Sequence, residues 1–216
     1  MIPPLLIFDC DGVLVDSEHI NSNVFYEMAL AEGIELPYEQ IHNEMLGGAL
    51  NVTIALLEKT HNKRLSKNFI PEFRKQTFER FKTDLKPIEG ILHSLEKLKH
   101  SKCIASNGPV EKMKVSLNLT GVLPHFNESH IFSAYDIQTW KPAPDLFLYA
   151  AKKMNHFPHQ AIVIEDSMNG VKAAKNANMK VIAYASKDKK DQLAALNPDI
   201  LIDDMHDLES AIKELS

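Results

Sequence analysis

Short apolar runs recur along the chain, and most are followed by a segment whose apolar positions have helical spacing. Strands that alternate with helices are typical of βαβ units, in which the strands lie parallel. The pattern therefore predicts an α/β protein with a Rossmann-like parallel sheet. The runs are Leu5 to Phe8, Cys103 to Ala105, Ala161 to Ile164, Val181 to Tyr184 and, more weakly, Asp199 to Ile202.

Apolar positions three and four residues apart mark the helices between these strands. Ile91, Leu95 and Leu98 share one face of a predicted helix, and a similar stripe runs from Phe147 to Met154. We expect these stripes to pack on the sheet as part of the core.

Between residues 16 and 87 the alternation of strands and helices stops. Ser17 is the predicted N-cap of a first helix and Gly33 its stop signal, and further helices are expected at about 38 to 46, 50 to 60 and 66 to 84. We therefore expect a small all-helical cap domain, residues 16–87, inserted after the first strand. Residues 1–15 and 88–216 would form the α/β core domain. The alternative is that the inserted helices pack on a face of the sheet.

The composition is that of a globular protein, with 44% hydrophobic residues among 216 and a formal net charge of -5. Nucleic-acid-binding proteins usually carry a basic face. The one cluster of basic residues here is Lys187 to Lys190, which we expect to be a solvated loop. We expect no nucleic-acid partner.

The two cysteines, Cys10 and Cys103, lie in or beside apolar runs. They favour packing over a disulfide and a reducing compartment, so we expect a cytoplasmic protein. No apolar run reaches the roughly 18 residues of a membrane span, and Met1 to Pro4 lack the features of a signal peptide. We expect no membrane partner, and a monomer, with a weak dimer as the alternative.

Polar residues follow three of the predicted strands. In an open parallel sheet, ligands bind beyond the carboxyl ends of the strands. We therefore expect one pocket built from all of these segments, together with a lysine on a proline-rich stretch. The segments are Asp9-Cys10-Asp11-Gly12, Ser106-Asn107-Gly108, Glu165-Asp166 and Trp140-Lys141-Pro142.

These residue types suit a phosphate group held beside a metal ion. Carboxylates from separate strand ends, with water and substrate phosphate, are the ligands that Mg²⁺ prefers. A Ser106 hydroxyl with the backbone N–H groups of Asn107 and Gly108 forms an anion cradle, and Lys141 adds a fixed positive charge. The sequence therefore predicts a small phosphorylated metabolite as substrate and Mg²⁺ as cofactor.

The paired aspartates predict the chemistry of the site. A carboxylate held beside Mg²⁺ can attack phosphorus and form an aspartyl-phosphate, and we assign this role to Asp9. Asp11, two residues on, is placed to protonate the leaving oxygen and later to deprotonate the attacking water. Gly12 lets the chain turn away and leaves room above the acids.

These motifs resemble those of the haloacid dehalogenase superfamily, in its capped branch of phosphatases and β-phosphoglucomutase-like enzymes. Asp9-Cys10-Asp11-Gly12-Val13, Ser106, Lys141 and Glu165-Asp166 match the four motifs in order. The resemblance implies that Asp9, the Asp11 backbone carbonyl and Asp166 bind Mg²⁺. It implies that Glu165 supports the metal through a water molecule or by contacting the groups that bind it. It also implies that Ser106 and Lys141 hold the phosphoryl group, and that Asn107 adds a donor.

Within that branch, "FDCDGVLVDSE", "SNGP" and "DIQTWKPAPDLF" resemble the bacterial phosphatases that act on 6-phosphogluconate. This makes 6-phosphogluconate the leading candidate substrate. Cap residues would decide the matter, and the candidates are Glu18, Asn21 and the Gly47 turn, with Lys63 and Arg64 as further donors. Helix surface and an ordinary interhelical turn are the alternative interpretation of these residues.

Three other functions compete with the phosphatase hypothesis. A β-phosphoglucomutase resembles this chain in core and cap, but the resemblance implies a His and an Arg where this chain has Asn21 and Leu50. A receiver-like signalling module would place its acidic pair ahead of a separate acceptor Asp. A non-catalytic phosphate-binding protein would have lost part of the constellation, whereas every part is present here. The sequence therefore favours net hydrolysis.

Overall fold

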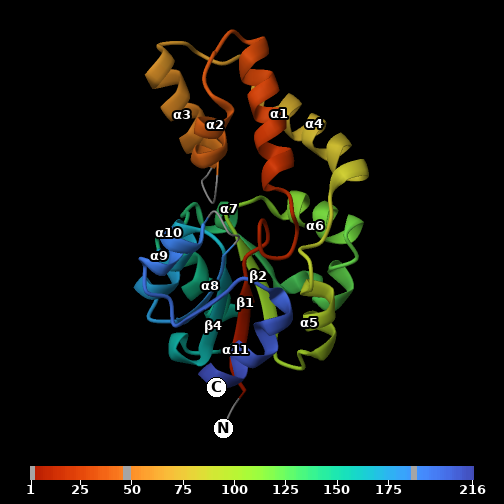
Figure 1. Ribbon diagram of the computed structural model, residues 1–216, viewed down its shortest axis with the longest axis vertical. Coiled ribbons are helices and arrows are strands. Elements are labelled where there is room, and N and C mark those ends of the chain that lie inside the picture. Colours follow the sequence, from red (N-terminus) through yellow and green to blue (C-terminus); the bar gives the residue numbers. More distant parts are fainter. Residues whose placement is uncertain (1–2, 46–49, 186–188) are drawn as a thin grey trace.

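A single parallel sheet forms the centre of the protein. The computed structural model describes residues 3–45, 50–185 and 189–216, and its strands lie in the order β3-β2-β1-β4-β5-β6 (Figure 1). All neighbouring strands pair in parallel. The predicted fold class is confirmed. The strands are β1 (Leu5–Phe8), β2 (Lys102–Ser106), β3 (Ile131–Ser133), β4 (Ala161–Glu165), β5 (Lys180–Tyr184) and β6 (Ile200–Ile202).

Both faces of the sheet are covered by helices, because successive side chains of each strand point to opposite faces. Leu6 and Phe8 of β1 belong to an apolar cluster with α5 (Ile91–Lys97), α6 (Val110–Leu119) and α11 (Leu208–Leu215). Leu5 and Ile7 belong to a second cluster with α8 (Asp145–Lys153) and α9 (Met168–Asn176). The short helices α7 (Ala134–Ile137) and α10 (Lys190–Ala194) complete the described core.

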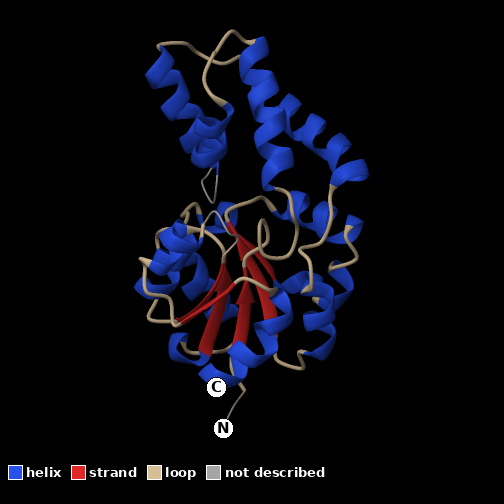
Figure 2. Ribbon diagram, in the orientation of Figure 1, coloured by secondary structure: helices blue, strands red, loops and turns tan. Residues whose placement is uncertain are grey.

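Four helices between β1 and β2 form a separate body above the sheet, and no strand of the described chain lies in it (Figure 2). They are α1 (Glu18–Ala31), α2 (Tyr38–Met45), α3 (Leu50–His61) and α4 (Phe69–Asp84). Phe25 packs edge-on against Phe69 and Phe73, with ring centroids 5.2 and 5.7 Å apart. This body, the cap, therefore has its own apolar centre.

Two chain segments connect the cap to the core, and they run side by side. Val15 and Pro87 form an isolated antiparallel bridge, and the Asp16 N–H donates to the Lys86 carbonyl at 2.9 Å. The expected domain boundaries fall at this pair of connections and stay a prediction.

The structure also bears on several smaller expectations. Ser17 is the N-cap residue of α1, as predicted, although its side chain makes no capping hydrogen bond. Cys10 and Cys103 are free and buried. The strand β3 was not predicted, because its three residues are too few to show a pattern. Within the described ranges, no helix has the length and apolar character needed to cross a membrane.

Candidate active site

The carboxyl ends of β2, β1 and β4 lie side by side, because these strands are neighbours in the sheet. Asp9 follows β1, Ser106 ends β2, and Glu165 ends β4 with Asp166 next to it. All four residues are at most 7% exposed. The structure therefore brings these predicted residues together at the edge of the sheet that faces the cap (Figure 1).

Lys141 lies between two of these carboxylates. Its ammonium group donates to Asp9 Oδ1 at 2.5 Å and to Glu165 Oε1 at 2.7 Å, and its backbone N–H donates to Asn107 Oδ1 at 3.0 Å. Burial lowers the pKa of Lys141, but the two carboxylates outweigh burial and raise it. Burial also raises the pKa of Asp9 well above its usual range, against the opposing charge of Lys141. A further cation would stabilise the ionised form of Asp9.

Glu165 is held by donors on both of its oxygens. Oε1 accepts from Lys141, and Oε2 accepts from the Ser167 backbone N–H at 2.8 Å and from its hydroxyl at 2.9 Å. A Cβ atom on Gly170, in the first turn of α9, would lie 1.8 Å from the Glu165 carboxyl group. Sequence analysis did not identify Gly170, although a glycine in the first turn of a helix that follows a motif is a usable signal.

Asp11 is bound by a lysine that sequence analysis missed. Lys112 Nζ on α6 lies 2.7 Å from each Asp11 carboxylate oxygen, and the Ser17 hydroxyl donates to Asp11 Oδ1. Burial raises the pKa of Asp11, but Lys112 and Ser17 outweigh it and lower the pKa below its usual value. Asp11 is therefore held as a carboxylate in this state.

A second unpredicted lysine, Lys189, lies between Asp166 and Glu18. Its ammonium group is 2.7 Å from Asp166 Oδ2 and 2.7 Å from Glu18 Oε2. Burial and the nearby Glu18 charge raise the pKa of Asp166 well above its usual range, and Lys189 opposes them. The expectation of a solvated loop was wrong for Lys189. Its side chain is 16% exposed, because it forms ion pairs with Asp166 and Glu18. Residues 187 and 188 of that run lie outside the described residues.

The turn after β2 is held by hydrogen bonds to neighbouring hydroxyl groups. The Gly108 backbone N–H donates to Ser106 Oγ at 3.2 Å, and the Ser133 hydroxyl donates to the Gly108 carbonyl at 2.7 Å. Ser106, Asn107 and Gly108 all line one cavity, together with Asp9, Asp11, Lys112, Lys141 and Glu165. The predicted phosphate-binding residues therefore face the same space as the paired aspartates.

That cavity has a volume of about 340 Å³ and lies between the core and the cap. Two residues of α4 bring polar groups to its cap side, Arg74 and Thr77, and sequence analysis named neither. Thr77 is 2% exposed, and its hydroxyl has no hydrogen-bond partner among the described residues. The other cap residues lining the cavity are Glu18, Asn21, Ser22, Met45, Leu50, Thr53, Phe73 and Phe78.

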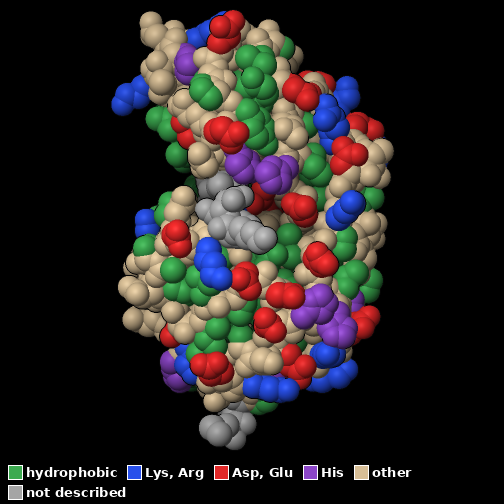
Figure 3. All heavy atoms as spheres, in the orientation of Figure 1, with side chains coloured by type: hydrophobic (Ala, Val, Ile, Leu, Met, Phe, Trp, Pro, Cys, Tyr) green, Lys and Arg blue, Asp and Glu red, His purple; other side chains and the backbone are tan. Residues whose placement is uncertain are grey.

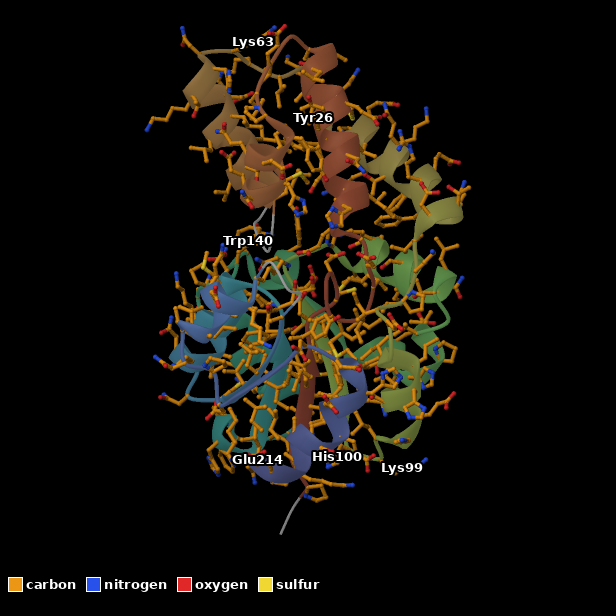
Figure 4. The ribbon with its side chains drawn as sticks, viewed as in Figure 1. Tyr26, Lys63, Lys99, His100, Trp140 and Glu214 are labelled. Atoms are coloured by element: carbon orange, nitrogen blue, oxygen red, sulfur yellow. The ribbon has the colours of Figure 1, made fainter. Side chains whose placement is uncertain are left out.

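The cap residues singled out from the sequence have different positions. Glu18 and Asn21 line the cavity, and Asn21 Nδ2 donates to Ser17 Oγ at 3.5 Å. Lys63 and Arg64 do not line it; Figure 4 shows Lys63 at the far end of the cap, whereas Trp140 lies at the edge of the core nearest the cap. Lys63 and Arg64 follow the end of α3, away from the core. Gly47 lies outside the described residues.

The donor set suits a magnesium ion. No cluster of three or more His, Cys, Asp or Glu side chains able to hold a metal occurs in the described part of the chain. Mg²⁺ does not require one, since it binds through one or two carboxylates with other oxygens. A Cβ atom on Gly12 would lie 2.2 Å from Asp166 Oδ2, so only glycine lets the β1 loop approach this carboxylate. Two buried carboxylates with raised pKa values, Asp9 and Asp166, then offer hard oxygen ligands.

Comparison with known proteins gives consistent results. The family model of the haloacid dehalogenase-like hydrolases matches residues 6–184. The 6-phosphogluconate phosphatase of Escherichia coli (strain K12) is 35% identical over 182 residues, which cover 84% of this chain and 82% of the relative. The phosphorylated carbohydrates phosphatase of Thermotoga maritima is 28% identical over 185 residues, covering 82% of each.

The solved structure of a haloacid dehalogenase-like protein of unknown function from Agrobacterium tumefaciens is also similar. It superposes with a TM-score of 0.82 at 30% sequence identity and covers 99% of each chain. The family model spans the strand ends that carry Asp9, Ser106 and Asp166. This chain is therefore an enzyme of the haloacid dehalogenase-like hydrolase family, in its phosphatase branch.

Proposed function

We propose that this protein is a Mg²⁺-dependent phosphatase of a small sugar phosphate or sugar-acid phosphate, with 6-phosphogluconate as the leading substrate. The observation that carries the proposal is that Asp9 and Asp11 line one cavity with Ser106 and Lys141. A nucleophile, a proton carrier and a phosphate cradle are the groups that phosphoryl transfer through an aspartate requires. The free, buried cysteines suit a reducing compartment such as the cytoplasm.

Asp9 and Asp166 are the side chains proposed to hold Mg²⁺, together with the Asp11 backbone carbonyl. Glu165 would support the metal through a water molecule or by contacting the groups that bind it. When bound, the ion supplies positive charge against the phosphoryl oxygens. The Ser106 hydroxyl and the Gly108 turn would bind the same oxygens on the other side. Lys141 would hold the Asp9 carboxylate in line for attack and balance its charge.

Hydrolysis would proceed in two displacements at phosphorus. In the first, an Asp9 oxygen forms a bond to phosphorus, the bond to the leaving oxygen breaks, and Asp11 gives that oxygen a proton. In the second, a water oxygen bonds to phosphorus, the bond to Asp9 breaks, and the water gives a proton to Asp11. In the described state Lys112 keeps Asp11 ionised. Asp11 must therefore separate from Lys112 before it can act as the acid.

The cap wall supports a sugar acid as the leaving group. Arg74 lines the cavity and forms no ion pair with any described residue, and the unpartnered Thr77 hydroxyl lies on the same helix. A guanidinium binds a carboxylate through two parallel hydrogen bonds. The carboxylate of gluconate would give Arg74 such a partner, whereas a neutral sugar would not.

The test compares 6-phosphogluconate with glucose 6-phosphate, which carries its phosphate on the same carbon but has no carboxylate. The wild type should prefer 6-phosphogluconate, and Arg74→Met should lower its kcat/KM about ten- to hundredfold while leaving glucose 6-phosphate nearly unchanged. Arg80→Met is the matched control, because Arg80 is on the same helix and pairs with Glu27 at 2.8 Å. Equal losses for both substrates would contradict the assignment of Arg74.

A second assay separates hydrolysis from isomerisation. β-Glucose 1-phosphate is supplied with a bisphosphate primer, and free phosphate and glucose 6-phosphate are followed together. We expect phosphate to appear faster. Leu50 lines the cavity at the position compared with the mutase Arg, and it offers no charge to retain a bisphosphate intermediate. Faster formation of glucose 6-phosphate would establish the mutase instead.

A further inference from the structure

Lys189 joins three parts of the molecule that are distant in the sequence. It lies immediately before α10, and it bridges Asp166, which follows β4, to Glu18, the first residue of α1 in the cap. Both contacts are 2.7 Å, and the three side chains are between 5% and 18% exposed. Exposed ion pairs contribute little, but a pair with this burial is screened much less by solvent.

Carboxylates outnumber ammonium groups in the ion-paired cluster at the site. Among the described residues, five carboxylates, those of Asp9, Asp11, Glu18, Glu165 and Asp166, form ion pairs with three ammonium groups, those of Lys112, Lys141 and Lys189. With all groups ionised, this cluster has a formal charge of -2. One divalent cation would neutralise it. Figure 3 shows acidic and histidine side chains gathered at the waist between the cap and the core.

We propose that Lys189 is the internal counter-cation of the magnesium site, and that Mg²⁺ competes with it for Asp166. This inference rests on the magnesium site of the proposed function. Lys189 is a positioning residue: it touches neither the phosphoryl group nor the nucleophile, and acts through the carboxylate it holds. Because its other partner is Glu18 of the cap, the strength of its hold on Asp166 depends on a cap residue.

Two substitutions should then have opposite effects on metal binding. Lys189→Met removes the competing charge and leaves Asp166 and Glu18 without their ammonium partner, so Mg²⁺ should bind more tightly. Glu18→Gln removes an acid from the cluster and leaves Lys189 paired with Asp166 alone, so Mg²⁺ should bind more weakly. If Lys189 served only to keep the loop folded, both substitutions would weaken binding.

The experiment is calorimetric titration of the full-length protein with Mg²⁺ alone, in the absence of substrate. We expect a Kd about tenfold lower for Lys189→Met and about threefold higher for Glu18→Gln, as the loss of one unit charge near a divalent ion predicts. Lys190→Met is the matched control, since Lys190 pairs with exposed Asp203, and its Kd should equal that of the wild type. Lys189→Arg keeps the charge and should restore the wild-type Kd.

Circular dichroism is used to check that each variant is folded. If Lys189→Met is not folded, Lys189→Gln replaces it. Weaker binding in both substitutions, or no change in either, would overturn the role of Lys189. If the wild type binds Mg²⁺ and releases phosphate while the variants do not diverge, only this inference fails. If the wild type neither binds Mg²⁺ nor hydrolyses a phosphate ester, the proposed function fails, and the inference with it.

Discussion

The two walls of the central cavity differ in how their polar groups are satisfied. On the core side, Asp9, Asp11 and Glu165 each form an ion pair with a lysine. On the cap side, Thr77 of α4 has no hydrogen-bond partner and Arg74 of α4 no carboxylate among the described residues, and four of the eight other cap residues that line the cavity are apolar. A buried polar group without a partner costs free energy unless a ligand supplies one. This difference fits the proposed function, in which core residues carry out the reaction and cap residues contact the leaving group.

The largest expected effect is on the core side. Asp11→Asn removes the proposed proton carrier but keeps the size of the side chain and an oxygen that can accept the hydrogen bond from Ser17. We expect kcat to fall by about 10²- to 10⁴-fold, with KM changed little. Steady-state kinetics on p-nitrophenyl phosphate and on a sugar phosphate test this, because p-nitrophenolate leaves without being protonated whereas a sugar alkoxide requires a proton. An equal and small loss on both substrates would show that Asp11 carries no proton.

Gly170→Ala tests how tightly the core wall is packed. The added methyl group would overlap the Glu165 carboxyl group, so Glu165 or the start of α9 must move. We expect the free energy of unfolding to fall by about 1–3 kcal/mol, the usual cost of overpacking, and kcat to fall with it. Denaturant titration measures the first and phosphate release the second. A variant with wild-type stability and activity would contradict this packing argument.

Thr77→Val should have opposite effects on stability and on binding. Removing an unpartnered buried hydroxyl should raise the free energy of unfolding by up to about 1 kcal/mol, whereas KM for the sugar-acid substrate should increase severalfold. Thr83→Val is the control on the same helix, because the Thr83 hydroxyl is exposed and donates to the Arg80 carbonyl. If Thr77→Val left KM unchanged, the cap wall would lose its role in substrate binding.

The smallest effect concerns His42, on α2 of the cap. Burial, then the charges of His19 and Lys189, lower the pKa of His42 below 6.5, and Glu39 opposes them. The unfolded chain therefore binds the proton more readily, and the stability that neutral His42 contributes is lost as the pH falls below 6.5 toward the lowered value. The wild-type Tm should fall more than that of His42→Gln between about pH 7.5 and pH 5.5. If Tm fell equally with pH in the wild type and in His42→Gln, the lowered pKa of His42 would be contradicted.

The core half of the site could be predicted because its residues stand directly after buried strands. Adjacent parallel strands bring their carboxyl ends to one edge, so position in the sequence fixes position in space for Asp9, Ser106 and Asp166. Lys112 and Lys189 come from helix α6 and from the loop before α10. A lysine in such segments is usually solvated, and nothing local indicates which acid it will meet.

Apart from Glu18 and Asn21, the cap half could not be predicted, because the side of a helix that faces the cavity depends on packing between the two bodies. One signal was present in α4. Phe69, Phe73 and Phe81 share its buried face at intervals of four residues, and Thr77 occupies the remaining place in that series. Thr77 is the polar residue in this apolar series, and its buried hydroxyl was a signal of a polar contact on that face of α4.

The most direct test of the account is the identity of the phosphorylated residue. The enzyme is mixed with Mg²⁺ and 6-phosphogluconate, quenched with acid within the first turnover, digested, and sequenced by mass spectrometry. We predict phosphate on Asp9, with none on Asp11 and none anywhere in an Asp9→Asn variant. A covalent phosphate on another residue, or phosphate release with inversion of configuration at phosphorus, would contradict the account.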